Sequence, residues 1–138
     1  MNLTRPVASI AAVVLAATGI ALAAPAQASN SQFPGEANRL NMYEDDSYSG
    51  HFEARASYDT DFHNDSFNDQ LSSFVNKTDN WWILYENINY GGYRVCVRPH
   101  SHDANIGNDT TKEDDISSVK MFGTTKPSGC DDTTGTAN

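Results

Sequence analysis

Basic residues are scarce in this chain. Its 138 residues include 9 Lys and Arg against 18 Asp and Glu, and the formal net charge is −9 at pH 7. A surface of this charge repels nucleic acid and anionic lipid, so we expect neither a nucleic-acid partner nor membrane insertion. The same charge also repels itself, which lowers stability unless bound cations neutralise it.

Cysteine and histidine are also few, with two and four residues respectively. His100 and His102 lie two positions apart, whereas His51 and His63 are isolated, and these spacings are not typical of a zinc site. The sequence also lacks a nucleophile elbow of the Gly-x-Ser-x-Gly type. Because no local signature of zinc or hydrolase chemistry is present, we expect that the protein is not an enzyme.

Long apolar runs are absent except at the N-terminus, over residues 10–24. Arg5 precedes this run and Ala26-Gln27-Ala28 follows it as a small-x-small cleavage site, which is the pattern of a secretory signal peptide. A transmembrane anchor is the alternative, but the run is short for that purpose and Pro25 ends it. We therefore expect residues 1–28 to be removed and a mature chain of residues 29–138 to be secreted.

Both cysteines remain in the mature chain. For an exported protein a disulfide between Cys96 and Cys130 is the default expectation. Closing a loop of roughly 34 residues would stabilise the fold by about 3–4 kcal/mol by restricting the unfolded chain. Two free thiols are the alternative.

No segment after the leader has a helical periodicity long enough to predict a helix. Short alternating segments between turn residues instead predict an antiparallel all-β domain. Residues 29–39 and 124–138 are predicted to be a flexible lead-in and a loose tail that Cys130 pins. Residues 57–67 and 100–113 look polar and irregular, with Phe62 and Phe67 as anchors. The predicted strands cover residues 40–44, 51–56, 71–75, 82–85, 93–98 and 116–122.

The domain of residues 40–123 contains one motif twice, in residues 40–77 and 81–123, at an offset of roughly 42 residues. Each copy has about four strand-sized pieces, which suits a Greek key, and neither could bury its apolar face alone. We expect the repeated glycine to have positive φ and the first tyrosine to cover the hairpin. The matched residues are Tyr43 with Tyr85, Tyr48 with Tyr90, Gly50 with Gly92, Ser72 with Ser117, and Ser73 with Ser118.

The repeated segments resemble the aromatic-glycine signature of βγ-crystallin Greek keys. Residues 43–50 read Tyr-Glu-Asp-Asp-Ser-Tyr-Ser-Gly, and residues 85–92 read Tyr-Glu-Asn-Ile-Asn-Tyr-Gly-Gly. Residues 68–73, Asn-Asp-Gln-Leu-Ser-Ser, also fit the microbial calcium-binding signature Asn/Asp-Asn/Asp-x-x-Ser/Thr-Ser at every position. The resemblance covers residues 40–122 and implies an all-β sandwich of two Greek key motifs.

The resemblance also implies two Ca²⁺ ions, each held by oxygen atoms from both motifs. The implied metal ligands are the backbone carbonyls of Glu44, Gln70, Glu86 and Asp115, the hydroxyls of Ser72 and Ser117, and the side chains of Asn68, Asp69 and Asp114. Glu113 is also an implied metal ligand, but it departs from the signature because it stands where Asn or Asp is usual, so we expect two unequal sites. The alternative is that these corners are polar turns in a relative that has lost calcium.

The same sequence features also allow a second function, that of an inhibitor or a toxin-like protein. Small exported proteins with crystallin folds and disulfides include bacterial inhibitors of metalloproteases and toxin-like proteins. A protease partner is therefore the alternative to calcium binding. An inhibitor needs a rigid protruding loop, and the sequence offers residues 57–67 and 100–112, although neither has a distinctive reactive-site residue.

Overall fold

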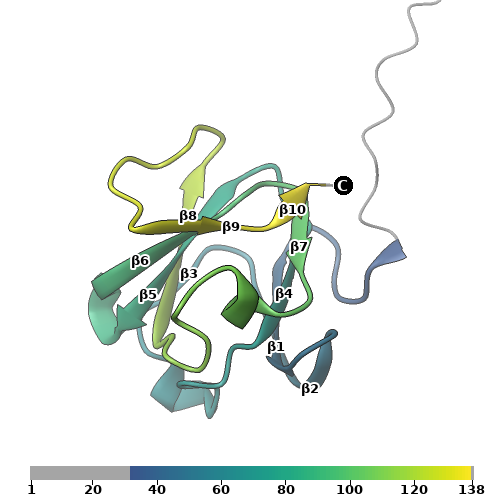
Figure 1. Cartoon of the computed structure of the whole chain (residues 1–138), viewed down its shortest axis with the longest axis horizontal. Coiled ribbons are helices and arrows are strands. Elements are labelled where there is room, and N and C mark those ends of the chain that lie inside the picture. The colour runs from purple at the N-terminus through teal and green to yellow at the C-terminus, as the bar shows by residue number, and fades with distance from the viewer. Residues whose placement is uncertain (1–31, 138) are drawn as a thin grey trace, which may run out of the picture.

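The computed structural model describes residues 32–137, and the predicted leader lies outside this range. Within it the chain forms two five-stranded sheets that enclose a common core (Figure 1). No helix of the described residues is long and apolar enough to cross a membrane. The strands are β1 (Leu40–Asp45), β2 (Ser49–Arg55), β3 (Tyr58–Asp59), β4 (Ser73–Asn76), β5 (Trp81–Asn87), β6 (Gly91–Val97), β7 (Ser101–Asp103), β8 (Ser118–Gly123), β9 (Asp132–Thr134) and β10 (Thr136–Ala137).

Each half of the chain gives three neighbouring strands to one sheet and one short strand to the other. The first sheet has the order β10-β7-β4-β1-β2, and the second has the order β3-β8-β5-β6-β9. The exchange of β3 and β7 means that neither half completes its sheet alone. The predicted all-β sandwich of two Greek key motifs is confirmed.

The core lies between the two sheets and draws on both halves. Trp82 is fully buried in this core, while Trp81, the residue before it, packs on the outer side of the same sheet. Phe62 and Phe67 are fully buried, which confirms them as anchors. The remaining core side chains are Leu40, Met42, Leu71, Phe74, Leu84, Val95, Val97, Ile106, Ile116 and Val119.

Two segments that looked irregular contain short regular elements. Residues 57–67 include β3 and the 3-10 turn η2 (Phe62–Asp65), and residues 100–113 include β7 and η4 (Ile106–Asn108). Two predicted strands also begin later than expected, at Ser73 and Ser118, because the preceding residues form tight corners. Strands of two or three residues leave no alternating pattern long enough to detect in the sequence.

The ends of the domain are more ordered than the sequence suggested. The tail was expected to be loose except at Cys130, yet it pairs β9 in parallel with β6 and β10 antiparallel with β7. The expectation of a purely antiparallel fold is therefore wrong at β9. In the lead-in, the Phe33 ring stacks on His102 at 3.8 Å, and the Lys77 ammonium donates to the Phe33 carbonyl at 2.7 Å. Residues 33–36 are thus held against the first sheet rather than flexible.

Candidate functional site

The two hairpins that lead into the candidate site have the same geometry. Gly50 and Gly92 have φ values of 77° and 74°, a conformation that costs glycine less than any residue with a Cβ. The side-chain carboxylates of Glu44 and Glu86 each accept the backbone N–H seven residues later, both at 3.1 Å. The predicted positive φ of the repeated glycine is confirmed.

The second serine of each Ser-Ser pair fixes its hairpin. Ser73 accepts the backbone N–H of Tyr48 at 3.0 Å and donates to the carbonyl of Asp45 at 2.6 Å. Ser118 makes the equivalent two bonds in the second hairpin, at 3.2 and 2.7 Å. Both serines are fully buried, so these bonds satisfy groups that water cannot reach.

The first tyrosine of each motif packs against its own hairpin. The Tyr43 ring lies 6.0 Å from that of Tyr48, and the Tyr85 ring lies 5.3 Å from that of Tyr90. Both first tyrosines are more than nine-tenths buried. The predicted covering role is therefore confirmed in both copies.

The first serine of each pair reaches across to the other half. The Ser72 hydroxyl donates to Asp114 Oδ1 at 3.2 Å, and the Ser117 hydroxyl donates to Asp69 Oδ1 at 3.1 Å. The two acidic corners therefore exchange partners. We call these places the Ser72 corner (Ser72, Glu113, Asp114 and Asp46) and the Ser117 corner (Ser117, Asn68, Asp69, Glu86, Asp115 and Lys112).

Backbone bonds join the corners in the same crossed manner. The Asp69 N–H donates to the Ile116 carbonyl at 3.1 Å, and the Asp114 N–H donates to the Leu71 carbonyl at 3.3 Å. Asp69 and Asp114 both have a left-handed backbone, with φ of 54° and 57°. This conformation turns each chain sharply at the point where its acidic side chain faces the other half.

The Ser72 corner concentrates negative charge. Burial raises the pKa of the Glu113 carboxyl, the nearby carboxylates of Asp46 and Asp114 raise it further, and the Ser72 hydroxyl lowers it. Glu44 starts its hairpin beside this corner, because the carbonyl of Tyr43, the preceding residue, accepts the Ser72 N–H at 3.0 Å. A cation at this corner would relieve the repulsion among its carboxylates.

The Ser117 corner already contains a positive charge. The Lys112 ammonium lies 2.6 Å from Glu86 Oε1 and 3.4 Å from Asp115 Oδ2. Its hydrogen bond is the largest cause that lowers the pKa of Glu86. The corner also has an unused acceptor, since Asn68 Oδ1 is buried and has no hydrogen-bond partner within the described part of the chain.

The donor set fits a hard cation only in part. Among residues 32–137, no three His, Cys, Asp or Glu side chains converge in a way that could hold a metal ion. A Ca²⁺ ion would therefore need the hydroxyl, amide and carbonyl oxygens that the sequence suggested, including those of the half-buried Gln70 and the exposed Asp115. Two features are consistent with a bound Ca²⁺ ion: the buried Asn68 Oδ1 atom, which has no hydrogen-bond partner within the described residues, and the clustered carboxylates of the Ser72 corner.

The two loops expected to protrude in an inhibitor are packed onto the sandwich. Residues 57–67 are held by buried Phe62 and by Arg55, whose guanidinium pairs with Asp59 and Asp65 at 2.8 and 2.6 Å. Residues 100–112 are held by Ile106, which is buried in the core. Neither segment in this conformation has the protruding form expected of an inhibitory loop.

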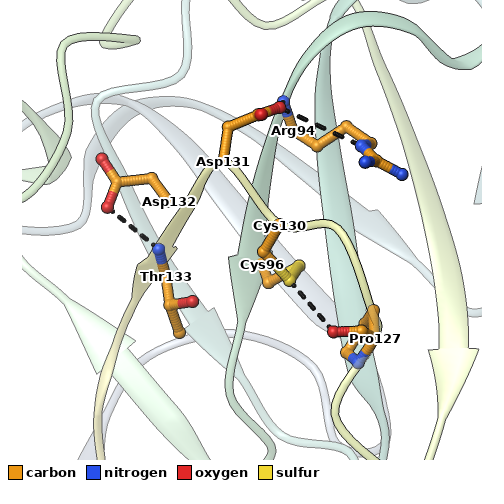
Figure 2. The surroundings of a disulfide bond; sticks show 7 residues. All are labelled: Arg94, Cys96, Pro127, Cys130, Asp131, Asp132 and Thr133. Atoms are coloured by element: carbon orange, nitrogen blue, oxygen red, sulfur yellow. Dashed lines mark hydrogen bonds and ion pairs between the residues drawn. A yellow bond between two sulfur atoms is a disulfide. The ribbon is translucent and has the colours of Figure 1, made fainter.

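A different loop protrudes, between β8 and β9 (Figure 1). The predicted disulfide between Cys96 and Cys130 is confirmed, and it ties the end of this loop to β6 (Figure 2). Beside it the Asp131 N–H donates to the Arg94 carbonyl at 2.9 Å, and the Arg94 N–H donates to Asp131 Oδ2 at 2.8 Å. The sequence did not predict this loop as functional, although Cys130 already marked it as tethered.

Comparison with solved structures gives the fold class. A βγ-crystallin from Ciona intestinalis is 23% identical, with a TM-score of 0.57 over 61% of this chain and 99% of that one. A βγ-crystallin from an archaeon is 24% identical, with a TM-score of 0.53 over 63% and 100%. A βγ-crystallin domain from Clostridium beijerinckii is 23% identical, with a TM-score of 0.53 over 61% and 97%. At these identities the likeness establishes the βγ-crystallin fold alone.

Comparison of the sequence gives the family. The family model described as peptidase inhibitor family I36 matches residues 28–97, just over half of the chain. The chain belongs to this family. No curated protein matches it. The matched region contains the first motif, β5 and β6, and it ends next to Cys96.

Proposed function

We propose that this chain is a secreted, non-catalytic inhibitor of a peptidase, built on the βγ-crystallin fold. The observation that carries the proposal is membership of peptidase inhibitor family I36 across residues 28–97. The architecture supports it, because crossed bonds between the halves and the Cys96–Cys130 disulfide make a rigid body. A rigid inhibitor loses little conformational freedom on binding.

The test is an inhibition assay with the mature chain, residues 29–138, carrying its disulfide. Endopeptidases of the metallo, serine, cysteine and aspartic classes are each incubated with increasing amounts of the protein. We expect saturable inhibition of at least one class, with the inhibitor intact by mass spectrometry at the end. If no class is inhibited even at a large molar excess, or if the protein is simply degraded as a substrate, the proposed function is wrong.

Calcium binding at the two corners is a second candidate function. It is favoured by the reciprocal Ser72–Asp114 and Ser117–Asp69 bonds and by the unpartnered Asn68 oxygen. Bound Ca²⁺ would supply positive charge that links the two halves, and Ser72, Glu113 and Asp114 would hold it at the corner without a lysine. Because Lys112 already compensates part of the Ser117 corner, we expect the Ser72 corner to bind more tightly.

Calorimetric titration tests this second function. The mature chain is titrated with CaCl₂, and the titration is repeated with Ser72→Arg and with Ser117→Arg. We expect two unequal binding events and a melting temperature that is higher with calcium than with chelator. Loss of the tighter event in Ser72→Arg would support the assignment, whereas heats of dilution alone with superimposable melting curves would contradict calcium binding.

A further inference from the structure

The end of the described chain crosses from one sheet to the other. β9 pairs in parallel with β6 of the second sheet, and β10 pairs antiparallel with β7 of the first sheet (Figure 1). Gly135 joins the two strands with φ of 100°, and a Cβ at this position would collide with the Ser101 hydroxyl. The chain therefore lies directly against β7 where it changes sheets. We call residues 130–137 the C-terminal strap.

The strap is tied covalently at its start and by hydrogen bonds further on. Cys130 is bonded to Cys96 of β6. At the far end of β9 the buried Thr134 hydroxyl donates to Oδ2 of Asp103, which belongs to β7 in the opposite sheet. Thr134 is therefore a point at which the strap is held to the first sheet before β10 begins.

The Thr134 hydroxyl lies between two carboxylates. Besides Asp103, it lies 3.2 Å from Oδ2 of Asp109, the exposed residue that follows η4. A hydroxyl has one hydrogen, so it can donate to only one of these carboxylates at a time. When both are ionised, the other contact joins two acceptors with no proton between them. One added proton completes the chain, because protonated Asp109 can donate to the Thr134 oxygen while Thr134 donates to Asp103.

The surroundings of Asp103 favour uptake of that proton. Burial raises the pKa of the Asp103 carboxyl, and the charge and hydrogen bond of Asp109 raise it further, against the lowering effects of the Thr134 hydroxyl and the Asn105 N–H. Two carboxyls that interact in this way take up protons as a pair. We call Asp103, Asp109 and Thr134 the Thr134 cluster.

The other groups around Asp103 leave its charge uncompensated at neutral pH. Burial lowers the pKa of His102, the preceding residue, so its ring is largely neutral at pH 7. Tyr48, from the first hairpin, lies 2.8 Å from His102 Nδ1 through its hydroxyl, and burial raises its pKa, so it is also neutral. The register partner in β4 is the apolar Phe74. The Arg98 guanidinium donates to a strap carbonyl at 2.8 Å.

We propose that the C-terminal strap is held by a proton-dependent contact, in which Asp103 and Asp109 share one proton through the Thr134 hydroxyl. In acid the three side chains form a continuous chain of hydrogen bonds that fixes the strap to the first sheet. Near neutral pH the exposed Asp109 turns into water, and the strap opens more readily and uncovers the edge of β6. This behaviour belongs to the strap, whichever of the functions proposed above is correct.

The direction of the pH dependence follows from Asp103. Because the fold raises its pKa above the ordinary 3.8, the contact stabilises the strap fully below that value. The contribution is lost as the pH rises through the raised pKa. A strap that loosens between acid and neutral pH is therefore the expected behaviour.

The first measurement follows the two carboxyls directly. The carboxyl-carbon NMR signals of Asp103 and Asp109 are recorded in the mature chain, with its disulfide intact, between pH 3 and pH 7. These signals also separate the carboxyls from the imidazole of His102. We expect both signals to move in two common steps, the upper one above the ordinary 3.8. Two independent single steps at an ordinary aspartate pKa would overturn the proposal.

The second measurement supplies the missing hydrogen by mutation. In Asp109→Asn the side-chain amide can donate to Thr134 at every pH and carries no charge. Hydrogen exchange of the strap amides at pH 7 should be about three- to ten-fold slower than in wild type, and the two proteins should become equal near pH 3. In a Thr134→Val background, which lacks the hydroxyl, Asp109→Asn should have no effect.

Glu36→Gln is the matched control for charge. Its side chain is 60% exposed, so the substitution changes net charge as Asp109→Asn does. The Glu36 N–H donates to Asn41 of β1, and β4 and β7 lie between β1 and β10 in the sheet. We expect strap exchange equal to that of wild type at both pH values.

The outcomes decide the role of the Thr134 cluster. Slower strap exchange in Asp109→Asn at pH 7, absent in Glu36→Gln and abolished by Thr134→Val, supports the proposal. If Asp109→Asn exchanges as wild type does at pH 7, or if its gain persists in Thr134→Val, the hydroxyl does not mediate a shared proton and the proposal fails. Inhibition and calcium binding are measured separately, so neither result bears on them.

Discussion

The two corners share a backbone and differ in charge. Each is closed by a serine that bonds an aspartate of the other half, at 3.2 Å for Ser72 and 3.1 Å for Ser117. At the Ser72 corner burial and then the carboxylates of Asp46 and Asp114 raise the pKa of Glu113, whereas at the Ser117 corner Lys112 lowers the pKa of Glu86. A duplicated fold has thus kept its hydrogen bonds and changed its electrostatics.

The halves also differ in how the chain tail supports them. The second sheet is tied covalently, because Cys130 joins β6 and β9 pairs with β6 beside it. The first sheet has only non-covalent support from the tail, through the pairing of β10 with β7. Mutating the equivalent residues of the two halves separately, and comparing the losses in stability or calcium affinity, therefore shows which features belong to the common fold and which to one half.

The largest effect is expected from removing the covalent tie. Cys96→Ser with Cys130→Ser should lower the free energy of unfolding by about 3–4 kcal/mol, because the disulfide spans 34 residues and restricts the unfolded chain. Urea denaturation measures this loss. Hydrogen exchange should rise most in residues 124–134, where local opening adds to the loss of global stability, and in β1 and β4 it should rise only as far as global unfolding requires. A stability equal to that of wild type would mean that β9 docks without the bond.

The local pattern of the sequence was sufficient for the duplicated hairpins but not for the exchanged strands. Tyr43, Gly50 and Ser73 each have a counterpart in the second half, and the structure gives each pair the same contacts. β3 and β7 have two and three residues, and they pair with strands of the other half. Such pairing depends on contacts between distant residues, which no local period encodes.

The candidate site was predictable in composition but not in pairing. The residues of both corners could be chosen from the repeated signature, yet nothing in it shows that Asp114 meets Ser72 rather than Ser117. The departure at Glu113 therefore belongs to the Ser72 corner. Lys112 directly precedes Glu113 in the sequence, but its bond to Glu86 depends on the fold.

The next largest effect should be equal in the two halves. Ser73→Ala and Ser118→Ala each leave a backbone N–H and a carbonyl without their buried partner, at a cost of about 2 kcal/mol. Urea denaturation of the two variants should give losses that agree within about 0.5 kcal/mol. A much larger loss for one serine would show that the two hairpins are not energetically equivalent despite their matched geometry.

A smaller effect should distinguish the corners through Lys112. Lys112→Ala removes the ammonium beside Glu86 and Asp115, so calcium affinity at the Ser117 corner should rise roughly three- to ten-fold. The Ser72 corner should be unaffected, which makes the two calorimetric events more alike. Lys120→Ala is the control, because that lysine lies over Tyr90 on another surface. Unchanged affinities in Lys112→Ala would mean that the lysine does not compete with the ion.

The smallest effects should have opposite signs at the two corners and depend on pH. Because the fold raises the pKa of Glu113 above its ordinary 4.5, its favourable contribution is present below that value and is lost as the pH rises. Glu113→Gln should therefore stabilise the calcium-free protein at pH 7, by less than about 1 kcal/mol, and this gain should vanish as the pH falls below 4.5.

Glu86 should behave in the opposite way. Lys112 lowers the pKa of Glu86 below its ordinary 4.5, so the carboxylate contributes stability above that value and loses it on acidification. Glu86→Gln should lower the melting temperature at pH 7 in chelator, and the difference from wild type should close as the pH falls through the lowered pKa. Melting curves of both variants between pH 3 and pH 7 measure this. If Glu113→Gln and Glu86→Gln shift the melting temperature in the same direction at neutral pH, the contrast in charge between the corners has no energetic consequence.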